Sequence, residues 1–243
     1  MKHFSGLALL TLVFCFSACS SATPLDTALK NYTNWKTITV TSQTQGKITN
    51  VRTDGEYRAL LNAFNENPSS KYPELVNWVE AHQKDVPAPL YLDLASMALK
   101  EKKPTNEILK WMFIGQTAGV YDTKRCRDPR SAGAYMELGY THSDLVNFVK
   151  SDPNQFRTIF LTVWADGLQW FKEHPYKASP MWVCSSGLSA IKYSGNKAQP
   201  ATYNELVIPD NELQMNWEKF LKSSASYLEA HKAEQKQLPA ASR

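Results

Sequence analysis

The sequence has little of what marks several protein classes. It contains four cysteines among 243 residues, too few for a disulfide-rich scaffold. Its 10 glycines and 13 prolines are spread along the chain, which excludes a collagen-like repeat or a long flexible spacer. The formal net charge of +4 is too even to predict nucleic-acid binding. A hydrophobic content of 43% is ordinary for a globular protein and excludes a disordered or polytopic membrane protein.

Sequence motifs of common enzymes are also missing. There is no HExxH, GxSxG, GxGxxG or P-loop, and the nearest serine turn, Cys184-Ser185-Ser186-Gly187, lacks the leading glycine. The mature chain's histidines are isolated rather than clustered: His82, His142, His174 and His231. We therefore assign no catalytic residue, metal ligand or cofactor from the sequence, and predict a protein that is not an enzyme.

The first residues have the three parts of a secretory signal. Lys2 and His3 give a basic start, and the apolar run of 7–16 is much shorter than the ~20 residues of a membrane-spanning helix. The run ends in Phe16-Ser17-Ala18-Cys19, which resembles the lipobox of bacterial lipoproteins, with Phe16 in the place of the usual leucine. The alternative is a plain cleavable signal followed by an incidental cysteine.

The lipoprotein resemblance implies a location and a domain plan. Residues 1–18 would be removed, and Cys19 would carry several acyl chains, enough for stable membrane attachment. Ser20 in place of an aspartate suggests, by the family's sorting rule, the periplasmic face of the outer membrane. We then expect a lipidated tether at 19–35, one periplasmic domain at 36–231 and a frayed tail at 232–243.

Two cysteines remain in the predicted domain, Cys126 and Cys184. The periplasm is oxidising, so an isolated pair there most simply forms a disulfide. A metal pair or a catalytic thiol are the alternatives, but no further Cys or His lies within four positions of either cysteine.

The periodicity of apolar residues predicts a mainly α-helical domain after a small N-terminal β-hairpin at 36–53. Alternation over 37–41 favours a strand, with a turn at 43–46 and a return at 47–53. A spacing of three and four residues then predicts helices, with capping residues and prolines at their starts. The expected helices begin at Asp54, Pro73, Leu90, Pro104, Ser131, Asp144, Asp152 and Asp210. The helix from Asp152 is apolar around most of its circumference, so we expect it to be central.

Two segments of the chain are faintly alike. Residues 88–95 (APLYLDLA) align with 132–139 (AGAYMELG), and later helices carry the similar cores 108–111 and 168–171. The pattern resembles the helix-pair repeats of the Sel1 and tetratricopeptide type, in which small residues allow close helix packing. We therefore expect an irregular array of antiparallel helix pairs, Sel1/TPR-like or an orthogonal bundle.

Candidate polar sites are few. Asp166 interrupts an otherwise apolar helix. Three interpretations are open: the side chain faces solvent, it pairs with an arginine, or it acts as a functional acid. For His142 and Asp144 there are two interpretations. The two side chains form an acid–base couple, or the segment is structural and either Ser143 or Asp144 caps the helix that begins there.

The densest charge lies at 124–130, where Arg125, Arg127 and Arg130 flank Cys126. A disulfide would hold this loop beside the aromatic segment with Tyr176 and Trp182, and Arg, Tyr and Trp are the residues that anchor protein interfaces. We predict a partner-binding site from these five residues; local pairing of the arginines and simple core packing are the alternatives.

The predicted function is binding of a protein partner by a lipid-anchored periplasmic protein. Helical lipoproteins with Sel1-like repeats resemble immunity lipoproteins that occlude the toxin effectors of type VI secretion, which implies such a toxin as the partner. The alternatives are a scaffold lipoprotein of an envelope complex and an enzyme that acts on envelope lipid or peptidoglycan.

Overall fold

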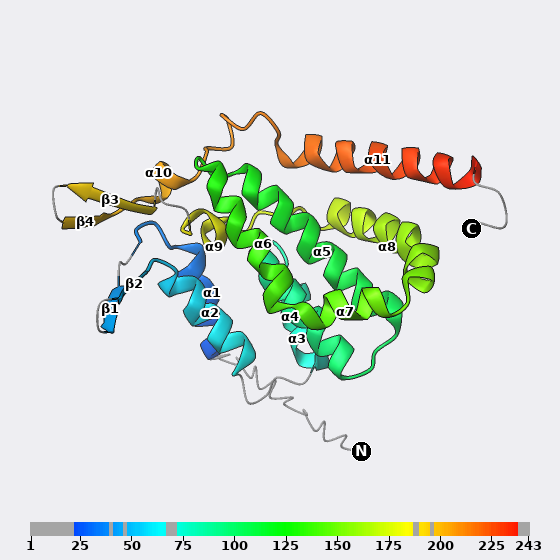
Figure 1. Cartoon of the computed structure of the whole chain (residues 1–243), viewed down its shortest axis with the longest axis horizontal. Helices are drawn as coiled ribbons and strands as arrows, with labels where there is room; N and C mark the ends of the chain where they lie inside the picture. Colours follow the sequence, from blue (N-terminus) through cyan, green and yellow to red (C-terminus); the bar gives the residue numbers. More distant parts are fainter. Residues whose placement is uncertain are drawn as a thin grey trace, which may run out of the picture.

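The computed structural model describes residues 22–38, 41–45, 48–66, 72–186, 190–194 and 197–237. Over these residues the chain is mainly α-helical, with a small N-terminal β-hairpin, so the predicted fold class is confirmed (Figure 1). The predicted signal and lipid-bearing Cys19 lie outside the described residues. Among the residues described, no helix is both long and apolar enough to cross a membrane.

The predicted tether is wrong from residue 24 onward. Helix α1 spans Pro24–Thr33 and buries Leu25, Leu29 and Tyr32 in the core. Its start is capped twice, because Thr23 Oγ1 accepts from the Asp26 amide over 3.1 Å while Asp26 Oδ2 accepts from the Thr23 amide over 3.0 Å. This helix is short, and its polar residues masked its apolar stripe in the sequence.

The first strand of the hairpin lies later in the sequence than predicted, whereas the second lies within the predicted return. Strand β1 (Thr41–Gln45) pairs antiparallel with β2 (Ile48–Arg52), and Thr41 lies opposite Arg52. Of the predicted first strand, 37–41, Thr37 forms an isolated bridge with Thr202, Thr41 begins β1, and residues 39 and 40 lie outside the described residues. A second hairpin, β3 (Ile191–Ser194) with β4 (Lys197–Pro200), was not predicted. Both hairpins leave the same end of the helical body (Figure 1).

The next two helices follow the prediction. Helix α2 (Gly55–Asn65) buries Leu60 and Phe64, and α3 (Tyr72–His82) buries Leu75 and Val79. Asp54 precedes α2 but forms no side-chain cap; its carboxylate instead pairs with Arg58 over 2.7 Å.

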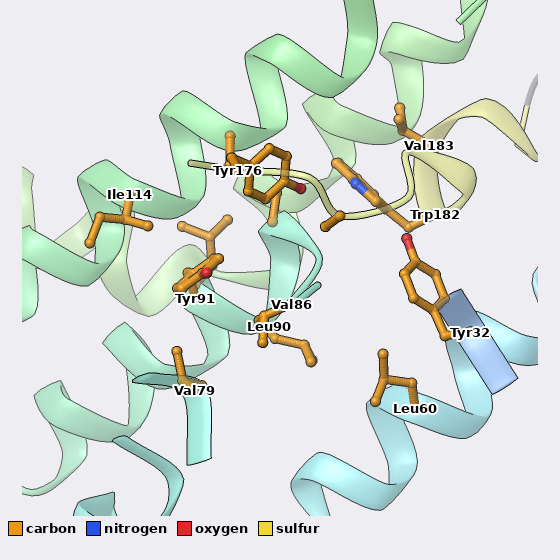
Figure 2. Packing of buried hydrophobic residues seen from close by; sticks show 14 of the residues in the cluster. Tyr32, Leu60, Val79, Val86, Leu90, Tyr91, Ile114, Tyr176, Trp182 and Val183 are labelled. Atoms are coloured by element: carbon orange, nitrogen blue, oxygen red, sulfur yellow. The ribbon is translucent and has the colours of Figure 1, made fainter. Parts of the chain in front are cut away.

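Helices α4 (Ala88–Lys100) and α5 (Thr105–Lys124) form the centre of the molecule. They pack closely because Gly115 of α5 lies against Ala88 and Leu92 of α4, where a Cβ would come within 3.1 Å of the Ala88 carbonyl oxygen. Figure 2 shows core residues from α1 to α5 and from the segment 176–183 gathered in one buried cluster. The expectation that the helix from Asp152 would be central is wrong.

That helix, α8 (Pro153–Glu173), lies to one side against α5 and exposes a polar face. Before it come the 3₁₀ turn η1 (Pro129–Ser131), α6 (Ala132–Thr141) and α7 (Ser143–Ser151). The two segments that align in the sequence differ in burial: residues 88–92 of α4 are all buried, whereas α6 has no buried residue.

The C-terminal part of the described chain returns across the body. It contains α9 (Met181–Cys184), α10 (Tyr203–Leu206) and α11 (Trp217–Gln237), which lies over α8 (Figure 1). The last helix was predicted from Asp210, but it begins at Trp217, where Asn216 Oδ1 accepts from the Lys219 amide over 3.0 Å. It also continues to Gln237, so the predicted fraying from 232 is wrong up to that residue.

Candidate binding cleft

A cleft of about 1450 Å³ lies between the ends of α5 and α8 and the chain segment 203–225. The segment is held in place by backbone hydrogen bonds on both sides of the Cys126–Val207 bridge. The Ile208 amide donates to the Arg125 carbonyl oxygen, and the Arg127 amide donates to the Leu206 carbonyl oxygen, each over 2.8 Å. The basic loop, residues 124–130, thus supports one wall of the cleft.

Five aromatic side chains line the cleft: Tyr121, Phe171, Tyr176, Tyr203 and Trp217. Trp217 at the start of α11 is the centre of the group: its ring centroid lies 4.7 Å from that of Tyr121 and 4.9 Å from that of Phe171. Tyr176 lies 5.5 Å from Trp217, and Tyr203 lines the cleft from α10. Rings of this kind offer large rigid contact area at low cost in side-chain entropy.

The floor of the cleft rests on a buried carboxylate, Asp122 on α5. Tyr176 Oη and Trp182 Nε1 both donate to its Oδ2 over 2.7 Å, and Arg125 Nη1 lies 3.3 Å from its Oδ1. Complete burial raises the pKa of Asp122 to about 6, against the lowering influence of Arg125, Trp182 and Tyr176. The network joins α5 to the segment 176–182.

Arg125 connects this network to the cleft. It is only 7% exposed and lines the cleft beside Tyr121, with the guanidinium carbon 5.6 Å from the ring centroid. Its Nη1 also donates to the Ala178 carbonyl oxygen over 2.6 Å. Its Nε is buried and has no hydrogen-bond partner among the residues described, and the same holds for the indole Nε1 of Trp217.

The charges around the cleft are mostly positive. Lys172, Lys177 and Lys222 join Arg125 in the lining, against the two acids Asp210 and Glu218. The three lysines are exposed, and within the described part of the chain none has an ion-pair partner.

The predicted disulfide is confirmed. Cys126 and Cys184 are bonded, with their Cα atoms 5.1 Å apart. The bond brings the basic loop to the aromatic segment, as expected.

Of the five residues predicted to form a partner-binding site around this disulfide, Arg125 and Tyr176 line the cleft, whereas Trp182 does not. Arg125, Tyr176 and Trp182 are each at most 7% exposed and are joined through Asp122, so they form a buried network beside the cleft rather than an exposed surface patch. The exposed Arg127 and Arg130 lie outside the cleft lining.

Both exposed arginines are paired, but only Arg130 pairs locally with Asp128, as the alternative interpretation predicts; Arg127 pairs with an acid far along the chain. Arg127 Nη2 lies 3.4 Å from Glu212 Oε2, and Arg130 forms a bidentate pair with Asp128, with N–O distances of 2.9 and 3.1 Å.

Two other candidates have structural explanations. Asp166 is exposed, as the solvent-facing interpretation predicts. His142 does not pair with Asp144: its Nε2 lies 3.1 Å from Asp93 Oδ1, while Asp144 accepts a hydrogen bond from Ser96 over 3.2 Å. The α7 N-terminus at His142 also has no side-chain cap, so neither the acid–base couple nor the capping account is correct.

Comparisons with other proteins indicate no function for the chain, so a function has to be argued from the cleft. No family model matches the chain, and neither a curated protein nor a solved structure is significantly similar to it. Within the part of the chain that the structure describes, no group of three or more His, Cys, Asp or Glu side chains could hold a metal ion.

The sequence indicated the cleft only indirectly. Its aromatic residues, Tyr121, Phe171, Tyr203 and Trp217, belong to separate segments that no local motif connects. Asp122 had one available signal, because an acid three positions before Arg125 on the same helix face predicts an ion pair.

Proposed function

We propose that this chain is a lipid-anchored protein of the periplasmic face of the outer membrane that binds a protein partner in the C-terminal cleft. The observation that carries the proposal is the lining of the cleft, which combines the Trp217 aromatic group with Arg125 and exposed lysines. Trp, Tyr and Arg dominate the energetics of protein interfaces.

The size of the cleft favours an extended partner segment. Pockets for drug-sized ligands have volumes of about 300–1,000 Å³, whereas this cleft measures about 1450 Å³. Asn204, Asn211 and Asn216 add polar groups that suit the amides of a polypeptide backbone.

The walls of the cleft are suited to binding without refolding. The segment 203–208 is hydrogen-bonded to the basic loop, and that loop is tied to α9 by the disulfide. A preformed site loses less conformational entropy on binding than a loop that must become ordered. The resemblance of the N-terminus and helical pattern to immunity lipoproteins makes a secreted toxin effector the first partner to test.

The binding proposal is tested by site-specific photocrosslinking in cells. The full-length chain would carry p-benzoylphenylalanine at Asn211, which is exposed and lines the cleft, or at Glu80, exposed on α3. We expect a discrete higher-mass adduct from position 211 and none from position 80. Equal adducts from both positions, or none from 211 at normal expression, would overturn the proposal.

The anchoring proposal has a separate test. Cells expressing the parent chain or its Cys19→Ser variant would be labelled with radioactive palmitate and fractionated. We expect label and membrane association in the parent and loss of both in the variant. Equal labelling of the two would contradict lipid attachment at Cys19.

A further inference from the structure

We infer that the cleft recognises acidic polypeptide, with a carboxylate of the bound segment received by Arg125 at the floor and by the lysines at the rim. The inference deepens the proposed function and depends on it, because it names the chemistry of the partner segment.

The first argument is the incomplete pairing of the Arg125 guanidinium. Its Nη1 is occupied by Asp122 and by the Ala178 carbonyl oxygen. Its Nε is buried and has no hydrogen-bond partner among the described residues. The Nε and Nη2 groups form the edge of an arginine that binds both oxygens of a carboxylate in parallel.

The second argument is the fixed position of that edge. Arg125 is more than nine-tenths buried, held by Asp122 on one side and by the ring of Tyr121 on the other. A buried donor without an acceptor is unfavourable, because it has lost its hydrogen bonds to water. A carboxylate of the bound segment that reaches Nε supplies the missing acceptor, while Nη1 keeps its contacts with Asp122 and the Ala178 carbonyl oxygen.

Trp217 also lines the cleft and also has a buried donor that lacks an acceptor in the described part of the chain. Its indole Nε1 is buried and has no acceptor among the described residues, while its ring packs against Tyr121 and Phe171. Two unpartnered donors that both flank Tyr121 and line one cleft favour a ligand that brings hydrogen-bond acceptors.

The third argument is charge complementarity at the rim. Lys172, Lys177 and Lys222 are exposed in the lining and have no ion-pair partner in the described part of the chain, even though Glu218 lies one turn before Lys222 on α11. Cations that line a cleft attract an acidic segment and disfavour a basic one.

The test uses two synthetic peptides labelled with fluorescein. One repeats Ser-Glu-Phe four times and the other repeats Ser-Gln-Phe four times, so they differ in charge but not in length or aromatic content. Binding to the full chain in detergent is measured by fluorescence anisotropy. We expect the acidic peptide to bind at least about tenfold more tightly, with the difference shrinking as salt is raised.

Charge reversal locates the effect in the cleft. Lys222→Glu, which changes the lining, should weaken the acidic peptide by about five- to tenfold. Lys219→Glu is the matched control, because Lys219 is exposed on the same helix but does not line the cleft. It should change the affinity by less than about twofold. Equal effects of the two variants would overturn the inference.

A third variant examines the floor. Arg125→Lys keeps the positive charge but removes the two parallel N–H donors of the guanidinium. It should therefore reduce the preference for the acidic over the glutamine peptide. Its melting temperature is measured alongside, and if it unfolds, the two lysine variants decide the matter.

The remaining outcomes separate this inference from the proposed function. If both peptides bind equally and photocrosslinks at Asn211 persist, the cleft binds protein but not through carboxylates, and the inference is wrong. If neither peptide binds while dansyl-undecanoate does, the cleft is a lipid site, and both the inference and the proposed function fail.

Discussion

The indole Nε1 of Trp182 donates a hydrogen bond of 2.7 Å to the carboxylate of Asp122, 60 positions earlier in the chain. Tyr176 donates to the same oxygen, and Arg125 contacts the other. All four side chains are buried. This network and the nearby disulfide together join the end of α5 to the segment 176–184, and so they set the position of the cleft floor.

Removing the carboxylate should strongly destabilise the fold. Asp122→Ala would leave Arg125 as a buried charge without its partner, and Tyr176 and Trp182 without an acceptor. Breaking one side of such a pair costs about 3–5 kcal/mol, which we expect as the loss in unfolding free energy in urea titrations. The control is Asp166→Ala, an exposed position, where the change should stay within about 0.5 kcal/mol.

The same carboxylate should make stability depend on pH. Burial raises the pKa of Asp122 to about 6 from an unfolded value of 3.8, so the folded state holds its proton more strongly than the unfolded state. This contribution is complete below pH 3.8 and is lost as the pH rises through 6. Its full size is on the order of 3 kcal/mol.

The measurement compares the parent with Asp122→Asn between pH 4 and pH 7. We expect the unfolding free energy of the parent to fall over this range by on the order of 2 kcal/mol more than that of the variant, which has no titrating group here. Parallel pH profiles would show that the raised pKa is not a property of Asp122.

Much of the helical fold could be predicted because local signals determine it. Pro73 and Pro104 fix the starts of α3 and α5, and the spacing of Leu60, Phe64, Leu75 and Val79 identifies the buried faces. The disulfide was predictable because only two cysteines remain after Cys19, and an oxidising compartment favours their pairing. In α1, by contrast, the capping residues Thr23 and Asp26 were present, but the polar composition of 20–34 concealed them.

The cleft could not be predicted because it depends on contacts between distant segments. The walls near Tyr203 and Trp217 are set by backbone pairing of Val207 with Cys126, which leaves no periodic pattern in either segment. The burial of Arg125 depends on Asp122 and Ala178, and residue type alone places an arginine at the surface.

Close packing of α4 on α5 gives a sensitive test of the central helix pair. A Cβ at Gly115 would lie 2.8 Å from Leu92 Cδ2 and 3.1 Å from the backbone oxygen of Ala88. Gly115→Ala should therefore reduce the unfolding free energy by about 1–3 kcal/mol. The matched variant is Gly139→Ala on α6, where nothing lies within 4 Å; better helix propensity should raise stability there by about 0.5–1 kcal/mol. Two changes of the same sign would contradict the packing.

The pair of Asp93 and His142 should favour the folded state at lower pH. Burial alone would lower the pKa of His142, but the hydrogen bond and charge of Asp93, with the Leu138 carbonyl oxygen, raise it above its ordinary 6.5. Both ring nitrogens face acceptors, at 3.1 Å and 3.0 Å, so the protonated ring fits the site best. The stabilisation is complete below pH 6.5 and is lost as the pH rises through the raised value.

Melting temperatures at pH 6 and pH 8.5 test this pair. The parent should lose more stability than His142→Gln between the two conditions, because the glutamine carries no proton that is lost. An unchanged difference would mean that Asp93 does not hold the proton on His142.

The disulfide should affect both stability and the cleft. Cys126 and Cys184 are separated by 58 positions, and closing a loop of this length lowers the entropy of the unfolded chain by an amount worth roughly 4 kcal/mol. The double variant Cys126→Ser, Cys184→Ser should lose stability of that order in urea titrations. Because Cys126 lies between the hydrogen bonds that hold the segment 203–208, the variant should also give a weaker photocrosslink at Asn211 under conditions where it is still folded. If stability falls while the crosslink is unchanged, the backbone pairing alone is sufficient to hold the wall of the cleft.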